Sequence, residues 1–420
     1  MGSSVTEKGV NMTEPVTEKT AMIVVGTGAA GITAALDLAR SGREVHLVER
    51  EYTLGGQVLS LDKLYPTDHC AFCPLWTEVR NCVLHPLVTI HTASEVQQVK
   101  ASGGLLTVSV RRKPHYIDQA RCILCGRCVP VCPQDAVHPG PEHAYPQAYF
   151  IDADACDGCG ACVETCPTSA VDLSLKTEDI TLEAGGVVWA TGFEDHDLSS
   201  FEEFGYGAHP DILSSLQFED LIAEAGANKG LVLKKSTGSP PASVAFIQCA
   251  GARDTRIFSY CSAVCCMHAL KQAQWVKRRS PETGCTIFFT DMRTEGRHYY
   301  DYYLKHTKES ALELVRARPG LIHPMPDGSG IAIKYEDTLT RKRLIRVFDM
   351  VVLNGALRPS LASGNTRFSP GTDSQGLLSG LCGRMYACGF CKEPMDVESS
   401  AVQASSAAVR ACMEETPDDK

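Results

Sequence analysis

The stretch AMIVVGTGAAGITAALDLARSGREVHLVERE, residues 21–51, decides the fold of this chain. It predicts a buried strand, a glycine-rich turn, an amphipathic helix and a second strand that ends at Glu49. Gly26 permits the tight turn, Gly28 lets the backbone approach a pyrophosphate, and Gly31 lets helix and strand pack closely. Glu49 lies where a carboxylate can bind a ribose hydroxyl. The stretch is typical of a dinucleotide-binding βαβ unit, and a plain loop before a core helix is the alternative.

Two later segments indicate that this dinucleotide is FAD. LGGQ, residues 54–57, provides a second close-approach glycine pair directly after the acidic strand end. GGVVWATGF, residues 185–193, predicts a buried strand that breaks at Ala190, Thr191 and Gly192. This break resembles the ATG turn of flavoproteins with two dinucleotide-binding domains.

The last segment, residues 384–411, predicts a short strand, a glycine turn and a helix rich in Ala and Ser. In flavoproteins of this type the positive end of the final helix points at the flavin ring, where it would stabilise a reduced, anionic flavin. Those proteins usually have Asp after the turn glycine, whereas Phe390 follows Gly389 here, so the ribityl contact stays open. The residues expected to bind FAD are Gly26, Gly28, Ala29, Ala30, Gly31, Glu49, Arg50, Gly55, Gly56, Gln57, Ala190, Thr191, Gly192, Gly389 and Val397.

Eight cysteines form two copies of one spacing, C-x2-C-x2-C-x3-C-P, which matches the run that bacterial ferredoxins use for a 4Fe-4S cluster. Because the fourth cysteine of such a run usually ligates the neighbouring cluster, we expect the copies to exchange their last thiolates. One cluster would be held by Cys122, Cys125, Cys128 and Cys166, and the other by Cys156, Cys159, Cys162 and Cys132. Structural zinc and disulfides are the alternatives, but zinc sites seldom double this spacing and disulfides would not repeat a C-P ending.

A second Rossmann unit would bind NAD(P)H in glutathione-reductase-like flavoproteins, and residues 241–277 take its place here. The strand SVAFIQC and the helix CCMHALKQAQWVK are present, but Cys249, Ala250, Gly251 and Ala252 replace the GxGxxG turn. Without those glycines the backbone cannot easily make room for a pyrophosphate. We therefore expect no NAD(P)H binding in this lobe.

QCAGARD, residues 248–254, followed by YCSAVCCMHALKQA, residues 260–273, resembles the family of heterodisulfide reductase A subunits. The resemblance runs from Ala21 to Ala411 and implies a flavin domain with an inserted two-cluster ferredoxin module. It also implies that a third 4Fe-4S cluster is held by Cys249, Cys261, Cys265 and Cys266. The irregular spacing by itself leaves the alternative open that the adjacent Cys265 and Cys266 are a core contact and one reactive thiol.

Short relatives in that family include the A subunit of the quinone-interacting membrane-bound oxidoreductase and the corresponding subunit of class II benzoyl-CoA reductase complexes. The residues do not choose between them. Cys70 and Cys73, with Cys82 shortly after, form an incomplete ligand set. A cluster, a redox-active or partner-completed thiol pair and a structural role all remain open for these three cysteines.

The bulk composition indicates the cellular compartment of the chain and the classes of partner that it can bind. The chain has 420 residues, 44% of them hydrophobic, and a formal charge of -10, which argues against nucleic acid as a main partner. No apolar run approaches the roughly 20 residues needed to cross a bilayer, and the first residues hold no signal core. With twenty cysteines, the chain is expected to be cytoplasmic and reduced, with other redox subunits as partners.

The expected fold is α/β, a two-dinucleotide-binding-domain flavoprotein with a thioredoxin/glutathione-reductase-like FAD domain, an inserted two-cluster ferredoxin module and a degenerate second Rossmann lobe. The expected boundaries are a disordered tail at 1–20, FAD-domain segments at 21–113, 177–241 and 343–412, the ferredoxin module at 114–176, the degenerate lobe at 242–342 and a second tail at 413–420. The expected function is electron transfer between FAD and 4Fe-4S clusters in an anaerobic complex, with flavin-based electron bifurcation implied by the resemblance. The alternatives are a scaffold with a structural FAD and a stand-alone, NAD(P)H-dependent glutamate-synthase-like oxidoreductase.

Overall fold

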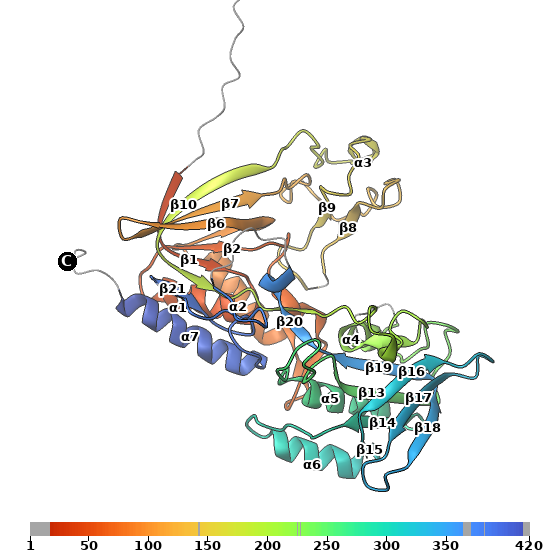
Figure 1. The fold of residues 1–420 in the computed structure, drawn as a ribbon. Helices are drawn as coiled ribbons and strands as arrows, with labels where there is room; N and C mark the ends of the chain where they lie inside the picture. The colour runs from red at the N-terminus through yellow and green to blue at the C-terminus, as the bar shows by residue number, and fades with distance from the viewer. Residues whose placement is uncertain are drawn as a thin grey trace, which may run out of the picture.

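The computed structural model describes residues 17–414 except residues 142, 225, 227, 364–370 and 382. Two α/β lobes are stacked, and a smaller module projects from the end of the first lobe (Figure 1). Residues 1–16 and 415–420, predicted as tails, lie outside the described residues, as does Cys382. The first strand begins at Thr17, inside the predicted N-terminal tail, because it pairs with a long central strand from that residue onward.

The first lobe is built on a seven-stranded sheet in which parallel and antiparallel strands share one central strand. In spatial order the strands are β5 (Val88–His91), β2 (Val45–Val48), β1 (Thr17–Val25), β10 (Glu178–Trp189), β7 (Leu105–Arg112) and β6 (Ser94–Ser102), and β21 (Met385–Ala387) also pairs with β10. The first half of β10 runs antiparallel to β7, and β10 runs parallel to β1 and, through its last residues, to β21. This one strand therefore joins the hairpin β6–β7 to the nucleotide-binding half of the sheet.

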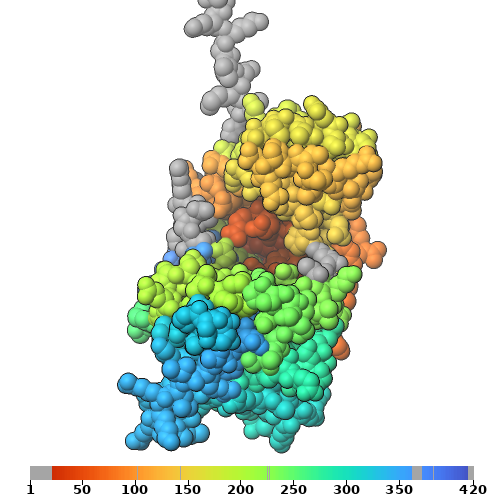
Figure 2. Space-filling model, turned by 90° about the vertical axis from the view of Figure 1, so that its right-hand side faces the viewer, coloured from red at the N-terminus to blue at the C-terminus, as the bar shows by residue number. Residues whose placement is uncertain are grey.

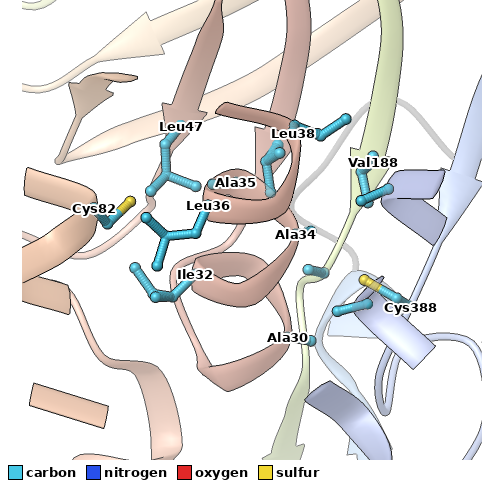
Figure 3. Packing of buried hydrophobic residues seen from close by; sticks show 14 of the residues in the cluster. Ala30, Ile32, Ala34, Ala35, Leu36, Leu38, Leu47, Cys82, Val188 and Cys388 are labelled. Atoms are coloured by element: carbon cyan, nitrogen blue, oxygen red, sulfur yellow. The ribbon is translucent and has the colours of Figure 1, made fainter. Parts of the chain in front are cut away.

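Helices α1 (Ala29–Arg40), α2 (Phe72–Leu84) and α7 (Val397–Met413) cover one face of this sheet (Figure 1). Figure 3 shows α1 at the centre, with Ile32 and Leu36 packed toward Leu47 and Cys82. The opposite side of α1 carries alanines instead, such as Ala34, and this side packs against β10 and α7. Small residues on both α1 and α7 let the two helices approach closely, which accounts for the Ala/Ser-rich last segment.

The ferredoxin module is inserted between β7 and β10, as the two cysteine runs predicted. It holds the short strands β8 (Val137–Pro139) and β9 (Tyr149–Ile151), which pair antiparallel, and helix α3 (Ala161–Thr165). Its small core contains Ile117, Ala136, Val137, Ile151 and Val171, and most of the cysteines of both runs pack around it. The thiols thus lie on a packed core rather than on a linker.

The second lobe has a five-stranded parallel sheet. In spatial order its strands are β12 (Ile212–Ser214), β19 (Met350–Gly355), β13 (Ser243–Ala250), β14 (Gly284–Phe289) and β15 (Glu313–Arg316). Helices α4 (Ser215–Ile222), α5 (Cys265–Arg279) and α6 (Tyr299–Glu309) pack on one face. The antiparallel sheet of β16 (Pro319–Pro324), β17 (Ile331–Glu336) and β18 (Arg343–Phe348) packs on the other.

Two predicted boundaries are therefore wrong. β12 and β19 fall in segments 177–241 and 343–412, which the sequence assigned to the FAD domain, yet both belong to the sheet of the second lobe. The reason is that parallel strands find their neighbours through crossovers, so sheet membership does not follow the turn signals along the chain. Helix α7 also extends through Met413, one residue into the predicted tail.

The remaining short elements lie mostly between the lobes or in their connections. They are η1 (Gly56–Ser60), β3 (Lys63–Leu64), β4 (His69–Cys70), β11 (Phe193–Asp195), η2 (Glu202–Phe204), β20 (Leu357–Pro359) and η3 (Ser360–Ser363). Among the described residues, no helix combines the length and the apolar character that a membrane span requires.

Candidate functional site

A cleft of about 550 Å³ opens at the carboxyl ends of β1, β2 and β10. Its volume is in the usual range for cofactor pockets. Figure 2 shows the red N-terminal residues at the bottom of a hollow, with the orange and yellow ferredoxin module above and the green second lobe below. Nearly all of the predicted FAD residues line it: Gly26, Gly28, Ala29, Ala30, Glu49, Arg50, Gly56, Gln57, Thr191, Gly192, Gly389 and Val397. The other three predicted residues, Gly31, Gly55 and Ala190, are not among the residues that line the cleft.

The three glycines of the first turn meet different surroundings. Gly26 has φ +101°, and a Cβ there would lie 2.4 Å from the Ala190 carbonyl oxygen. A Cβ on Gly31 would lie 1.8 Å from the Gly26 carbonyl oxygen, so helix α1 could not begin where it does. Gly28, in contrast, has no atom within 4 Å of such a Cβ. The space over Gly28 faces the cleft at the N-terminus of α1, where an anionic pyrophosphate fits.

Glu49 is buried at the end of β2 and already holds local hydrogen bonds. Its carboxylate accepts from the backbone N–H of Thr27 at 2.8 Å and from that of Glu51 at 2.9 Å. Burial raises the pKa of Glu49, and the hydrogen bonds from Glu51 and Thr27 only partly offset this. Its neighbour Arg50 lines the cleft and pairs with Glu194 at 2.9 Å. The first lobe therefore offers a carboxylate for a ribose and a guanidinium beside it.

The far end of the cleft is formed by β21, its turn and the start of α7. Met395, Asp396, Val397 and Ser400 line it, so the N-terminal end of α7 points into the cleft. The carboxylate of Asp396 caps this helix by accepting from the N–H of Ser399 at 2.7 Å. Phe390, which stands where related flavoproteins usually have Asp, lines the cleft too and packs on Phe193 with ring centroids 4.8 Å apart.

The two cysteine runs of the module share several local hydrogen bonds, although only the second run contains a helix, α3. The Cys122 N–H donates to the backbone carbonyl of Asp118 at 2.9 Å, and the Cys156 N–H donates to the backbone carbonyl of Asp152 at 3.0 Å. In each run the last cysteine accepts a backbone N–H at 3.3 Å, from Ala136 to the Cys132 sulfur and from Ala170 to the Cys166 sulfur. Such N–H···S bonds favour thiolates and are among the interactions that tune iron-sulfur clusters.

Thiols in each run lie close enough to influence one another. Burial, with Cys122 and Cys125 nearby, raises the pKa of Cys128, and burial, with Cys156 and Cys159 nearby, raises the pKa of Cys162. In the described part of the chain, however, no three His, Cys, Asp or Glu side chains converge on a point where one metal ion could bind. The assignment of these runs to 4Fe-4S clusters rests on their repeated spacing.

The second lobe gathers the other predicted quartet. Cys249 is the penultimate residue of β13 and has φ +57°. Cys265 and Cys266 begin α5, and Cys261 lies in the loop between β13 and α5. Burial raises the pKa of Cys265 well above its usual value, and the nearby Cys266, Cys249 and Cys261 add to that shift. Burial also raises the pKa of Cys266 to about 11. The four thiols therefore lie close enough to influence one another, as a shared ligand set requires.

Guanidinium groups surround this quartet. Arg253 and Arg293 lie within hydrogen-bonding reach of the Cys249 and Cys261 thiols, respectively. Arg318 donates to the Cys249 carbonyl at 3.4 Å. The quartet occupies the strand end and helix start where an α/β lobe ordinarily binds a nucleotide. The structure thus puts buried thiols where a nicotinamide pyrophosphate would need glycines.

Two family comparisons match parts of the chain. Residues 22–83 match the FAD dependent oxidoreductase family, and residues 121–170 match the 4Fe-4S dicluster domain. These segments cover the first βαβ unit with α2 and both cysteine runs of the module. The presence of FAD-type and 4Fe-4S dicluster domains is therefore supported independently of the geometry.

Curated relatives cover most of the chain. The second iron-sulfur A subunit of the CoB–CoM heterodisulfide reductase of Methanopyrus kandleri is 36% identical over 415 residues, which span 93% of this chain and 63% of that protein. The A subunit of the ferredoxin/F420H2-dependent CoB–CoM heterodisulfide reductase of Methanosarcina acetivorans is 39% identical over 360 residues, which span 81% of this chain and 45% of that protein. The chain is a homologue of the heterodisulfide reductase A subunits. It spans less than two thirds of the length of these relatives.

The fold of this A-subunit homologue is that of thioredoxin reductases. The thioredoxin reductase of T. acidophilum superposes with a TM-score of 0.55 at 15% identity, over 94% of this chain and 99% of that one. Lactococcus lactis thioredoxin reductase gives 0.53 at 15% identity, over 94% and 98%. The prediction of a thioredoxin-reductase-like FAD fold with a dicluster insert is confirmed.

Several residues that form the cleft of this A-subunit homologue carried no sequence signal. Tyr52 and Phe150 both line it and stack at a centroid distance of 5.0 Å with an interplanar angle of 10°. Phe150 belongs to β9 of the ferredoxin module, so the module forms part of the cleft wall. Lys113 also lines the cleft and pairs with Asp154 of the module at 2.6 Å. Only the position of Tyr52 just after the acidic strand end could have suggested a role.

Three side chains lie between the thiol quartet of the second lobe and the cleft of the first lobe. Tyr65 lies near Cys265 and Cys266 and packs edge-on against Tyr299, with ring centroids 5.2 Å apart. The Tyr299 hydroxyl donates to Asp396, which lines the cleft. Tyr65, Tyr299 and Asp396 thus link the neighbourhood of the quartet to the wall of the cleft.

The remaining cysteines divide by burial. Cys70 and Cys73 form a mutual thiol hydrogen bond at the start of α2, and Cys73 is exposed. Cys82 is separate from them, because it is buried in the core beside α1 and burial raises its pKa to about 12. The structure therefore does not bring the three together as one ligand set.

Proposed function

We propose that the chain is an electron-transfer subunit that passes electrons between FAD and 4Fe-4S clusters within a larger redox complex. The observation that carries this proposal is the stacked pair of Tyr52 and Phe150. One ring belongs to the dinucleotide cleft and the other to the ferredoxin module, and both line the same cavity. A cleft whose wall is built partly by the cluster-binding module keeps the two kinds of cofactor at a fixed separation.

The residues of the cleft have separate tasks in this proposal. The open space over Gly28 would accommodate the pyrophosphate, and Glu49 would accept hydrogen bonds from a ribose. The N-terminus of α7 would face the flavin ring and favour its negative charge. When bound, FAD exchanges two electrons and each cluster exchanges one, so the chain can couple two-electron to one-electron chemistry.

The cysteines hold the clusters in three groups. Cys122, Cys125 and Cys128 would be joined by Cys166, and Cys156, Cys159 and Cys162 by Cys132, which follows the crossing pattern of two-cluster ferredoxins. Cys249, Cys261, Cys265 and Cys266 would hold the third cluster. The arginines around that quartet would compensate its negative charge, and the contacts through Tyr65 and Tyr299 support its communication with the cleft.

We further propose that the partners are redox subunits that supply or accept these electrons in the cytoplasm. The homology to A subunits of heterodisulfide reductases supports a place in such a complex. We also propose that the flavin in this complex performs electron bifurcation. NAD(P)H is not proposed as a donor, because Cys249 and the start of α5 occupy the crevice that a nicotinamide nucleotide would use.

The test is anaerobic reconstitution of the full chain followed by reduction with two donors. We expect one FAD and about twelve iron atoms per chain, or about eight if the third quartet is empty. NADH should leave the flavin absorbance unchanged, whereas a low-potential one-electron donor should reduce clusters and flavin together. A flavin that stays oxidised after the clusters are reduced would support the scaffold alternative. Bleaching by NADH would support the NAD(P)H-dependent one.

A further inference from the structure

The two halves of the ferredoxin module provide an internal comparison. Their cysteine loops, residues 121–132 and 155–166, share the hydrogen bonds described above and the same left-handed positions. Gly126 and Gly160, for example, have φ +70° and +81°. The second run continues into helix α3 where residues 127–131 form turns, but at residues 124 and 126 the backbone matches that of residues 158 and 160.

Leu124 is the most informative difference. Its φ of 56° lies in the left-handed region, and the equivalent residue of the second loop is Gly158, with φ +75°. A leucine is strained in this conformation, whereas a glycine is not. Leu124 is also 45% exposed, so burial in this chain does not offset the strain. Strained residues that gain nothing from packing mark positions retained for another purpose.

The neighbours of Leu124 differ in the same direction. Ile123 is 63% exposed, and its equivalent is Asp157. Arg121 and Arg127 are exposed, with no ion pair or hydrogen bond to any described residue, and their equivalents are alanines. We call Arg121, Ile123, Leu124 and Arg127 the apolar–basic loop. It surrounds Cys125, the exposed cysteine of the first run.

We propose that the apolar–basic loop is the docking surface for a small, acidic iron-sulfur protein that exchanges electrons with the first cysteine quartet. The inference rests on the proposed function. It also specifies that the first cysteine quartet faces the partner, because the second loop has Asp157 and Gly158 where the first has Ile123 and Leu124. Exposed apolar residues ringed by unpaired arginines complement a partner with an apolar centre and an acidic rim. Because the chain as a whole has a formal charge of -10, a local basic surface is what an acidic partner would need in order to approach.

The test replaces the first loop by the residues of the second. The variant R121A/I123D/L124G/R127A copies Ala155, Asp157, Gly158 and Ala161, so each new residue already occupies the equivalent position of the second run. The Asp157 carboxylate accepts from the Cys159 N–H at 3.0 Å, and an aspartate at position 123 can do the same with Cys125. Binding of the anaerobically reconstituted full chain to a small acidic two-cluster ferredoxin is measured by calorimetry at low and high ionic strength.

We expect salt-sensitive binding of the wild type and about tenfold weaker binding of the variant. A matched control is I345D, because Ile345 is 62% exposed on β18 of the second lobe and away from the cysteines. It should bind like the wild type. Iron content and the EPR spectrum of each protein are recorded separately. Loss of the clusters from the wild type would refute the proposed function, whereas intact clusters with equal binding by variant and wild type would refute only the docking surface. Absence of salt-sensitive binding by a cluster-loaded wild type would refute it as well.

Discussion

Replacement of Glu219 by glutamine should loosen the second lobe at its junction with the first. The Glu219 carboxylate is fully buried and accepts from the side chains of Lys271, His268 at 3.1 Å and Gln272 at 2.9 Å. It also accepts the N–H of Asp62 from the first lobe at 3.0 Å. Glu219→Gln keeps the size but removes the charge, and it turns one acceptor into a donor that faces other donors.

The magnitude follows from the burial of the partner. Lys271 is 3% exposed, and among the described residues its ammonium otherwise donates only to the Lys63 carbonyl, at 2.9 Å. Removing one member of a buried ion pair typically costs about 3–5 kcal/mol, because the other charge stays buried and unpaired. Burial raises the pKa of Glu219, but Lys271 and His268 outweigh this and hold the pKa well below its usual range. The stabilisation is therefore present above the usual carboxyl pKa and is lost only as the pH falls through the lowered one.

Hydrogen exchange measured by mass spectrometry is the appropriate assay, because a chain with several lobes need not unfold in one step. The protection of α4 and α5 should fall by about a hundredfold or more in Glu219→Gln. Glu224→Gln is the matched control: Glu224 pairs with Arg279 at the surface and is 53% exposed, so its loss should cost at most about 1 kcal/mol. Unchanged exchange of α4 and α5 in Glu219→Gln would refute the reasoning.

Two further predictions concern the cofactor sites. Gly28→Ala should leave the thermal unfolding temperature near that of the wild type while weakening FAD binding about tenfold or more, because the added methyl enters open space over the cleft. Gly31→Ala should instead destabilise the fold by about 3 kcal/mol, since the methyl would collide with the Gly26 carbonyl; equal flavin titrations for the two variants would contradict this assignment. Cys132→Ser should alter the same EPR signal as a substitution in the second run, and Cys166→Ser the signal of the first run. The opposite pairing would disprove the crossing of the fourth thiolates.

Local patterns allowed the sequence to predict the parts of the site that are continuous along the chain. The strand, turn and helix around Gly28 and the repeated spacing of the cysteine runs each fit within a few dozen residues. Their chemistry follows from the residue types themselves, since glycines make room for phosphates and regularly spaced thiols hold clusters. The start of α5 at the adjacent Cys265 and Cys266 was also visible, because an amphipathic pattern follows them.

The contacts between distant segments could not be predicted in this way. Phe150 reaches the cleft because β9 folds back over the first lobe, and no periodicity in the module indicates where its outer face will pack. Glu219 is 52 residues from Lys271 in sequence, and neither residue signals a buried pair by itself. The strain at Leu124 became visible only from its φ, although the alignment of the two runs already places a leucine opposite a glycine.

The second lobe illustrates why similarity of fold does not transfer function. Its parallel sheet has the architecture of thioredoxin reductases, and the carboxyl ends of its strands form the crevice where such folds bind ligands. In this chain that crevice contains Cys249 at a left-handed strand end and Cys265 and Cys266 at the helix start. The position still favours an anionic ligand, because the arginines and the helix N-terminus remain. The third cluster that we propose would meet that electrostatic requirement through its thiolates, without the glycines that a pyrophosphate needs. In that proposal the lobe keeps the fold of thioredoxin reductases, and its cysteines rather than its sheet select the ligand.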